Sequence, residues 1–162
     1  MKKYIALTIA LTMTTLAGRA QTSGNITIAG TVANETSITV ASQAGYNSLP
    51  IAAGTVDQLV ANVTEKSNDR IGYTVTLNSL NAGSTAQAFL GGAAVGNLDI
   101  VNYTLKYNGT AVTLVSGSAV VTTSATRTPQ AGVVKGLAVT IPATWVNTDT
   151  YSDTLTLTIA AL

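Results

Sequence analysis

Residues 103–114, YTLKYNGTAVTL, decide the fold class of this chain. Two runs in which polar and apolar residues alternate flank the pair Asn108-Gly109. Strict alternation indicates a half-buried β-strand. Asn-Gly is the dipeptide that best accommodates the positive φ angles of a two-residue type I′ turn. The stretch therefore predicts a tight antiparallel β-hairpin.

The same alternation recurs on both sides of this hairpin. Further strand-like runs cover residues 26–32, 38–40, 56–64, 71–77, 118–123, 133–141 and 151–162, with a short strand around Phe89. Clusters of Gly, Asn, Ser and Asp separate these runs, and we expect EKSNDR (65–70) to be one of the turns. No stretch after the first twenty residues has the periodicity of an amphipathic helix of normal length. The pattern predicts an all-β sandwich or barrel.

The first twenty residues have the pattern of a secretory signal peptide. Two lysines precede the apolar residues 4–16, and Gly18 and Ala20 are the small residues expected before a cleavage site. The apolar stretch is shorter than the ~20 residues that a membrane-spanning helix needs. We therefore expect an exported protein without direct membrane insertion, whose mature form begins at Gln21.

The composition argues against catalysis and against nucleic-acid binding. Removing the 20-residue signal from the 162-residue chain leaves 142 residues, which suits one domain. Three of the eight basic residues leave with the signal, so five face seven acidic ones and the net charge is about −2. Such a chain lacks the basic patch that binds phosphates. It also has no cysteine and no histidine, so we expect no catalytic residue, no metal and no cofactor.

Two pairs of carboxylates, Glu65 with Asp69 and Asp149 with Asp153, are candidates for a glycosidase couple or a calcium site. Each pair lies beside turn residues, where short acidic side chains are expected to be solvated. We therefore interpret both pairs as surface residues. The aromatic residues, Trp145 among them, are interpreted as core or cross-strand side chains, with a sugar-stacking platform as the alternative.

Three segments of the chain resemble the pilin subunits of chaperone-usher fimbriae, in particular the cysteine-free kind and the related spore-coat-U-like proteins. They are NITIAGTV (25–32), KSNDRIGYTVTLNS (66–79) and TYSDTLTLTIAAL (150–162). The resemblance implies an immunoglobulin-like β-sandwich that lacks its final strand, with a hydrophobic groove left open. A periplasmic chaperone fills this groove first. The N-terminal strand of the next subunit then replaces it at an outer-membrane usher, by donor-strand exchange.

Carried over to this chain, the resemblance divides it into a signal peptide (1–20), a donor-strand extension (21–33) and a sandwich domain (34–162). The expected donor positions are Ile26, Ile28, Gly30 and Val32. The expected acceptor groove is lined partly by Leu155, Leu157 and Ile159. The alternative for residues 26–32 is an ordinary first strand, paired within its own sandwich.

The predicted function is therefore structural. We expect a subunit of a bacterial surface fimbria that forms a homopolymer with identical or related subunits and contributes to cell adhesion. It would be exported through the periplasm to the cell surface. The alternative is a secreted monomeric β-sandwich that binds a glycan or a surface protein. The two hypotheses differ in solution behaviour, because an isolated pilin is unstable or polymeric whereas a binding module is a stable monomer.

Overall fold

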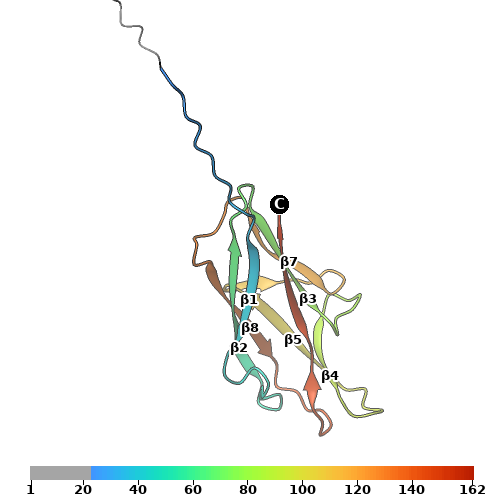
Figure 1. The fold of residues 1–162 in the computed structure, drawn as a ribbon. Helices are drawn as coiled ribbons and strands as arrows, with labels where there is room; N and C mark the ends of the chain where they lie inside the picture. The colour runs from blue at the N-terminus through green and yellow to red at the C-terminus, as the bar shows by residue number, and fades with distance from the viewer. Residues whose placement is uncertain (1–22) are drawn as a thin grey trace, which may run out of the picture. The chain divides into compact units, whose positions relative to one another are not determined.

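The computed structural model describes residues 23–162, and the predicted signal peptide (1–20) lies outside them (Figure 1). The described residues form ten strands and no helix, so the prediction of an all-β chain is confirmed. The strands are β1 (Thr36–Ser42), β2 (Thr55–Ser67), β3 (Tyr73–Ser79), β4 (Ala88–Gly92), β5 (Ile100–Tyr107), β6 (Thr110–Val112), β7 (Ser118–Ser124), β8 (Val133–Ile141), β9 (Tyr151–Ser152) and β10 (Leu155–Ala161). No helix among these residues is long and apolar enough to cross a membrane.

The strands form two antiparallel sheets within the compact body, Ala33–Leu162. The larger sheet has the order β1-β2-β8-β5-β4-β9, with β6 paired to β5. The smaller sheet has the order β10-β3-β7. Register shifts in β2 opposite β8 disturb the ladder, as β-bulges do where a sheet bends. In Figure 1 the larger sheet curls, and the arrangement fits a β-sandwich.

The hairpin on which the fold prediction depends has the expected turn. β5 and β6 pair with Tyr107 opposite Thr110. Asn108 and Gly109 between them have φ angles of 49° and 80°. Both values are positive, as a type I′ turn requires. The local sequence signal therefore acts as predicted.

The core lies between the inner faces of the two sheets. It includes Val75 and Leu77 of β3, Val101, Tyr103, Leu105 and Tyr107 of β5, and Leu137, Val139 and Ile141 of β8, all buried. Their spacing is the predicted two-residue alternation. Ile71 was expected on the same face as Val75, but it is exposed because the strand begins only at Tyr73. The preceding Gly72 has a φ of +114°, which ends regular strand geometry there.

Two other boundaries differ from the sequence prediction. The expected turn at residues 65–70 begins later, because β2 continues to Ser67 and buries Glu65. The closing run 151–162 is not one strand. Asp153 and Thr154 separate β9, which pairs with β4 of the larger sheet, from β10, which pairs with β3 of the smaller sheet. The chain thus passes from one sheet to the other at these two residues.

The strand register defines two ends of the body. One end holds the start of β1 paired with the end of β2 in the larger sheet, and the start of β3 paired with the end of β10 in the smaller sheet. The short connection 68–72 from β2 to β3 joins the two pairs at this end. We term it the entry pole, because the body begins there at Ala33. The opposite end holds the connections 43–54, 93–99 and 142–150, and we term it the loop pole. These two names are used below.

Candidate assembly groove

The candidate site lies between two strands that are each paired on one side only. β1 is an edge strand of the larger sheet, and β10 is an edge strand of the smaller sheet. The two strands approach each other across the sandwich. Within residues 23–162 neither free edge has a strand partner. A free edge presents unpaired N–H and C=O groups, which makes it a template for a further strand.

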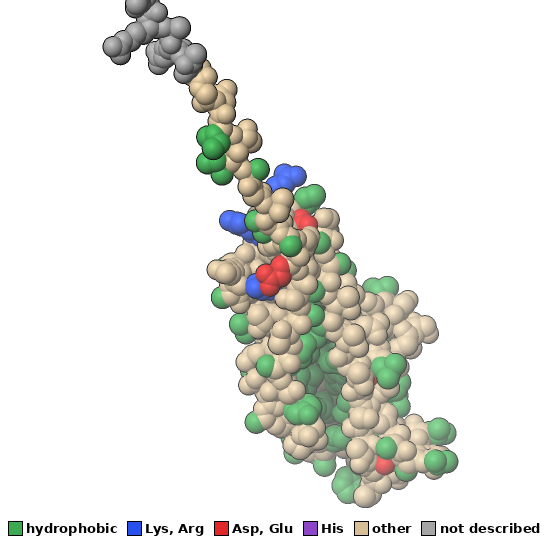
Figure 2. Space-filling model, in the orientation of Figure 1, with side chains coloured by type: hydrophobic (Ala, Val, Ile, Leu, Met, Phe, Trp, Pro, Cys, Tyr) green, Lys and Arg blue, Asp and Glu red, His purple; other side chains and the backbone are tan. Residues whose placement is uncertain are grey.

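A groove of about 290 Å³ opens between these two edges. Val40 and Ser42 of β1 form part of one wall, and Leu155 and Leu157 of β10 form part of the other. The groove bottom consists mainly of core side chains, namely Ala61, Leu90, Leu137, Val139 and Ile141, with the partly buried Val60 beside them. Figure 2 shows hydrophobic side chains along the bottom of this furrow. The core of the body is therefore open to a partner along β1 and β10.

The groove ends in polar groups toward the loop pole. Asp153 lies there and accepts hydrogen bonds from the Ser79 hydroxyl at 2.6 Å and from the Tyr103 hydroxyl at 2.6 Å. The backbone N–H of Asn81 donates to the same carboxylate at 3.0 Å. Burial, together with this carboxylate, raises the pKa of Tyr103 well above its usual value. These bonds fix Asp153 and Thr154, where the chain passes from β9 of the larger sheet to β10 of the smaller sheet, beside the groove.

The predicted donor segment is exposed. Residues 23–32 form no strand. Ile26, Ile28 and Val32 are 86%, 89% and 89% exposed. Gly30 is exposed too, with no atom near the position of a Cβ. Three large apolar side chains with strand-like spacing are thus available to a partner.

The predicted groove residues do not all lie in the groove. Leu155 and Leu157 line it, whereas Ile159 is half-buried on the same face of β10 without lining it. The sequence prediction missed Val40 of β1 and the pair Tyr46 and Leu49 of the following loop. The two loop residues are apolar side chains in an otherwise polar connection. That is a weak signal, because loops also expose single apolar residues.

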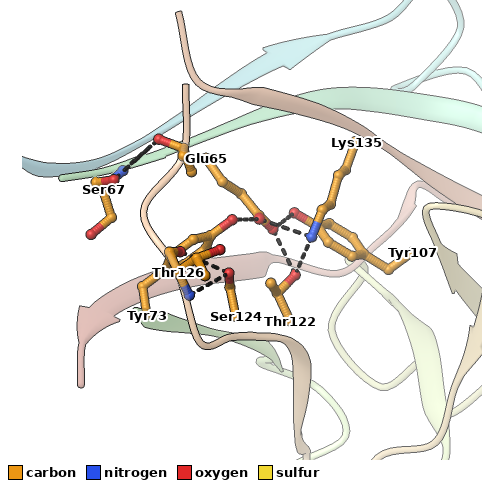
Figure 3. A network of polar contacts seen from close by, with 9 residues as sticks. Glu65, Ser67, Tyr73, Tyr107, Thr122, Ser124, Thr126 and Lys135 are labelled. Carbon is orange, nitrogen blue, oxygen red and sulfur yellow. Dashed lines mark hydrogen bonds and ion pairs between the residues drawn. The ribbon is translucent and has the colours of Figure 1, made fainter. Parts of the chain in front are cut away.

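A buried ionic cluster lies between the sheets near the entry pole (Figure 3). The Glu65 side chain is 0% exposed and forms an ion pair with Lys135, with 2.9 Å between Oε2 and Nζ. The hydroxyls of Tyr73, Tyr107 and Thr122 donate to the same carboxylate at 3.0, 2.7 and 2.8 Å. Its five members come from β2, β3, β5, β7 and β8, so the cluster links both sheets.

The Glu65 carboxyl keeps its charge at neutral pH. Burial alone would raise the pKa of the Glu65 carboxyl, but hydrogen bonds from Tyr107, Lys135 and Thr122 outweigh it and lower this pKa. Burial beside the carboxylate raises the pKa of Tyr73 to about 12. The Lys135 ammonium also lies 5.7 Å from the centre of the Tyr107 ring, within the range of a cation–π contact. Every polar group of the cluster has a partner, which makes its burial tolerable.

The structure corrects or refines the sequence interpretation of three side chains, Glu65, Asp149 and Trp145. Glu65 is not solvated, because it belongs to β2 and not to a turn. Asp149 is half-exposed and organises a loop instead: it accepts hydrogen bonds from the Ala94 N–H and the Asn97 amide. The Ala94 N–H and the Asn97 amide also lower the pKa of Asp149. Trp145 lies in the connection 142–150 and is 96% exposed, so the core interpretation is wrong for this residue.

Comparison with protein families and with curated proteins found no match for the chain. Its function must therefore be inferred from the groove and the exposed segment. In the described part of the chain no group of three or more acidic side chains is arranged to hold a metal ion.

Proposed function

We propose that the protein is a structural subunit of a bacterial surface fimbria, and that it polymerises by strand donation. In this proposal residues 21–33 of one copy occupy the groove of another copy, beside β10. One observation carries the proposal. The same chain combines an open apolar groove between two free strand edges with an exposed segment that has the alternation of a strand. The segment can supply the strand that the groove lacks, and the groove can bury the apolar side chains that the segment exposes.

Alternation decides which donor side chains would enter the groove. In an extended strand Ile26, Ile28, Gly30 and Val32 share one face, while Thr27 and Thr31 point the opposite way. Full burial of three such aliphatic side chains contributes ~1.5–3 kcal/mol each, or roughly 5–9 kcal/mol before the costs of ordering. Backbone hydrogen bonds to the free edge of β10 add to this. The contact is strong enough to persist in a fibre.

In this proposal the body is an immunoglobulin-like sandwich without its final strand. The position of that strand would be the groove between β1 and β10, and a periplasmic chaperone would fill it until an outer-membrane usher exchanges it for the next subunit. Export through the periplasm to the cell surface follows from the predicted signal peptide. The assembled fibre would contribute to cell adhesion. Support for this part comes from the resemblance at residues 25–32, 66–79 and 150–162.

A peptide experiment tests the proposal. The body alone (residues 33–162) should bind a hydrophobic dye and unfold at low temperature, because its groove is open. A peptide of residues 22–33 should displace the dye and raise the stability by ~2.7 kcal/mol when present at 100 times its dissociation constant. Calorimetric melts with increasing peptide measure both effects. A peptide with Ile26, Ile28 and Val32 replaced by Ser is the control, and it should do neither.

The same experiment separates the proposal from the monomeric binding module. A body that melts sharply at high temperature without the peptide, and ignores the peptide when it is added, would contradict strand donation. It would favour the binding module instead.

A further inference from the structure

We infer that neighbouring copies also make a direct end-to-end contact, in which the entry pole of the donating subunit seats on the loop pole of the accepting subunit around Trp145. The inference rests on the proposed function, because it concerns subunits that are joined by a donated strand. It adds a second surface to the assembly, outside the groove.

The loop pole carries a cluster of exposed apolar side chains. Trp145 is 96% exposed, and Val95 and Leu98 are also almost fully exposed. Figure 2 shows hydrophobic side chains on the surface at the lower end of the body. Single exposed apolar residues are common, but a group that includes a tryptophan is typical of an interaction surface.

Hydrogen bonds bring the two loops that carry these residues together. The backbone N–H of Asn147 donates to Asp99 at 2.8 Å. The Asn97 amide donates to Asp149 at 2.7 Å, and the N–H of Ala93 donates to the Thr150 carbonyl at 2.9 Å. Val95, Leu98 and Trp145 each lie within two residues of one of these bonds. The apolar cluster is therefore held on a tied pair of loops.

Charge differs between the two poles. Six charged side chains of the body form three ion pairs: Lys66 with Glu35, Lys106 with Asp57, and Lys135 with Glu65. The other charges of residues 33–162 separate by position. Arg70, Arg127 and Asp69 lie in the connections at the entry pole, whereas Asp99, Asp149 and Asp153 lie near the loop pole. The Leu162 carboxylate also lies at the entry pole, where the Leu162 N–H donates to the Gly72 carbonyl. The charges of the entry pole therefore balance. Within residues 33–162 the loop pole carries three aspartates outside the ion pairs, against which Arg70 and Arg127 of another copy can lie.

No flexible linker separates a donated strand from the body of the donating subunit. The Asn68 amide donates to the Ala33 carbonyl at 2.7 Å, and the Glu35 N–H donates to the Asn68 oxygen at 2.7 Å. These two bonds hold residues 33–35 to the entry pole. Val32 is the last predicted donor residue, so no free linker remains between the groove of one subunit and the body of the next. The two bodies must touch.

The direction of the donated strand decides which poles of two neighbouring subunits meet. A donor strand that runs antiparallel to β10 brings the donor's entry pole to the acceptor's loop pole. A strand that runs parallel to β10 brings two entry poles together, with Arg70 and Arg127 of both copies facing each other. That arrangement leaves Asp99 and Asp149 of the loop pole without a facing arginine. The antiparallel insertion instead places arginines against the aspartates and against Trp145, where guanidinium groups can stack.

Trp145 reports directly on this contact, because it is the only tryptophan of the chain. The experiment compares two states of the chain from Gln21 to Leu162. The first is the polymer. The second is the Ile28→Asp chain, which cannot donate its strand, with its groove filled by the peptide 22–33. We expect acrylamide to quench Trp145 strongly in the peptide-filled monomer and severalfold less in the polymer, with a blue-shifted emission.

Each outcome has one meaning. Polymers in which Trp145 is quenched as strongly as in the peptide-filled monomer would overturn the end-to-end contact and leave strand donation intact. Protection of Trp145 already in the peptide-filled monomer would also overturn it, because the peptide brings no second body. Absence of any polymer would instead contradict the proposed function itself.

A pair of variants tests the charges. Arg70→Glu with Arg127→Glu should restore strong quenching of Trp145 in the polymer, because it places like charges across the contact. The matched control, Arg70→Lys with Arg127→Lys, keeps the charge and should keep most of the protection. Both arginines are exposed, so neither variant disturbs the core. Equal protection in the two variants would show that the arginines do not face the loop pole.

Discussion

Replacing Ile28 with Asp should abolish assembly of the protein into fibres. In the proposed contact Ile28 points into a groove whose bottom is apolar. The substitution removes ~1.5–3 kcal/mol of aliphatic burial and adds a carboxylate without a partner, which costs a further few kcal/mol. A total of about 4 kcal/mol weakens each contact roughly a thousandfold. Negative-stain microscopy and size-exclusion chromatography of the variant measure the loss.

The neighbouring residue supplies the control for this prediction. Thr27→Asp introduces the same charge on the opposite face of the strand, so assembly should continue nearly unchanged. The Ile28→Asp subunit should still accept a wild-type peptide of residues 22–33, because the change lies outside its own groove. Fibres that form equally well with Ile28→Asp would contradict strand donation by this segment.

Replacing Glu65 with Ala should destabilise the body by about 3–5 kcal/mol. The substitution removes the carboxylate partner of the largely buried Lys135, whose remaining acceptor is the Thr122 hydroxyl. It also deprives three hydroxyls of their acceptor. A matched control lies close by: Glu35→Ala breaks the exposed pair with Lys66 and should cost less than about 1 kcal/mol. Urea unfolding of the two variants, each with its groove filled by peptide, measures the difference. Equal losses would contradict the structural role of the cluster.

The same cluster predicts how stability depends on pH. The folded-state pKa of Glu65 lies below its ordinary value of 4.5. The contribution of the Glu65 carboxylate to the free energy of unfolding is therefore complete above about pH 4.5. It is lost as the pH falls through the folded-state pKa. At high pH the stability depends on Tyr73, because the pKa of its hydroxyl is raised from 10.0 to about 12. Its contribution is complete below pH 10 and is lost toward pH 12.

Local sequence signals predict the strands of this protein well. The Asn108-Gly109 turn depends only on backbone preferences within the hairpin, so the sequence is sufficient to place it. Alternation likewise places Leu155 and Leu157 on the inner face of β10. These features require no knowledge of which strands become neighbours.

The sequence pattern does not predict features that depend on contacts between residues far apart in the chain. Glu65 resembles a turn residue until β3, β5, β7 and β8 supply its four partners. The groove depends on the approach of β1 to β10. These two strands are close in space but lie near opposite ends of the body's sequence. The division of the closing run at Asp153 depends on Ser79 and Tyr103, which bind its carboxylate. In each case long-range pairing overrides local pattern.

Cross-linking between two copies tests the central claim, strand donation into the β1–β10 groove, most directly. The chain has no cysteine, so introduced thiols have no background. One subunit carries Ile28→Cys, and a second carries a single cysteine in place of Leu155, Leu157 or Ile159. Neighbouring inward-facing side chains on paired strands lie close enough for a disulfide. Mixtures of the two subunits are assembled, oxidised and separated on a non-reducing gel.

Strand donation predicts that Ile28→Cys forms a covalent dimer with at least one of the three β10 cysteines. Thr27→Cys, which faces the other way, should form none with the same three. Dimers that appear equally with cysteines at 27 and 28, or with neither, would contradict the claim that this segment completes the groove of a neighbouring subunit.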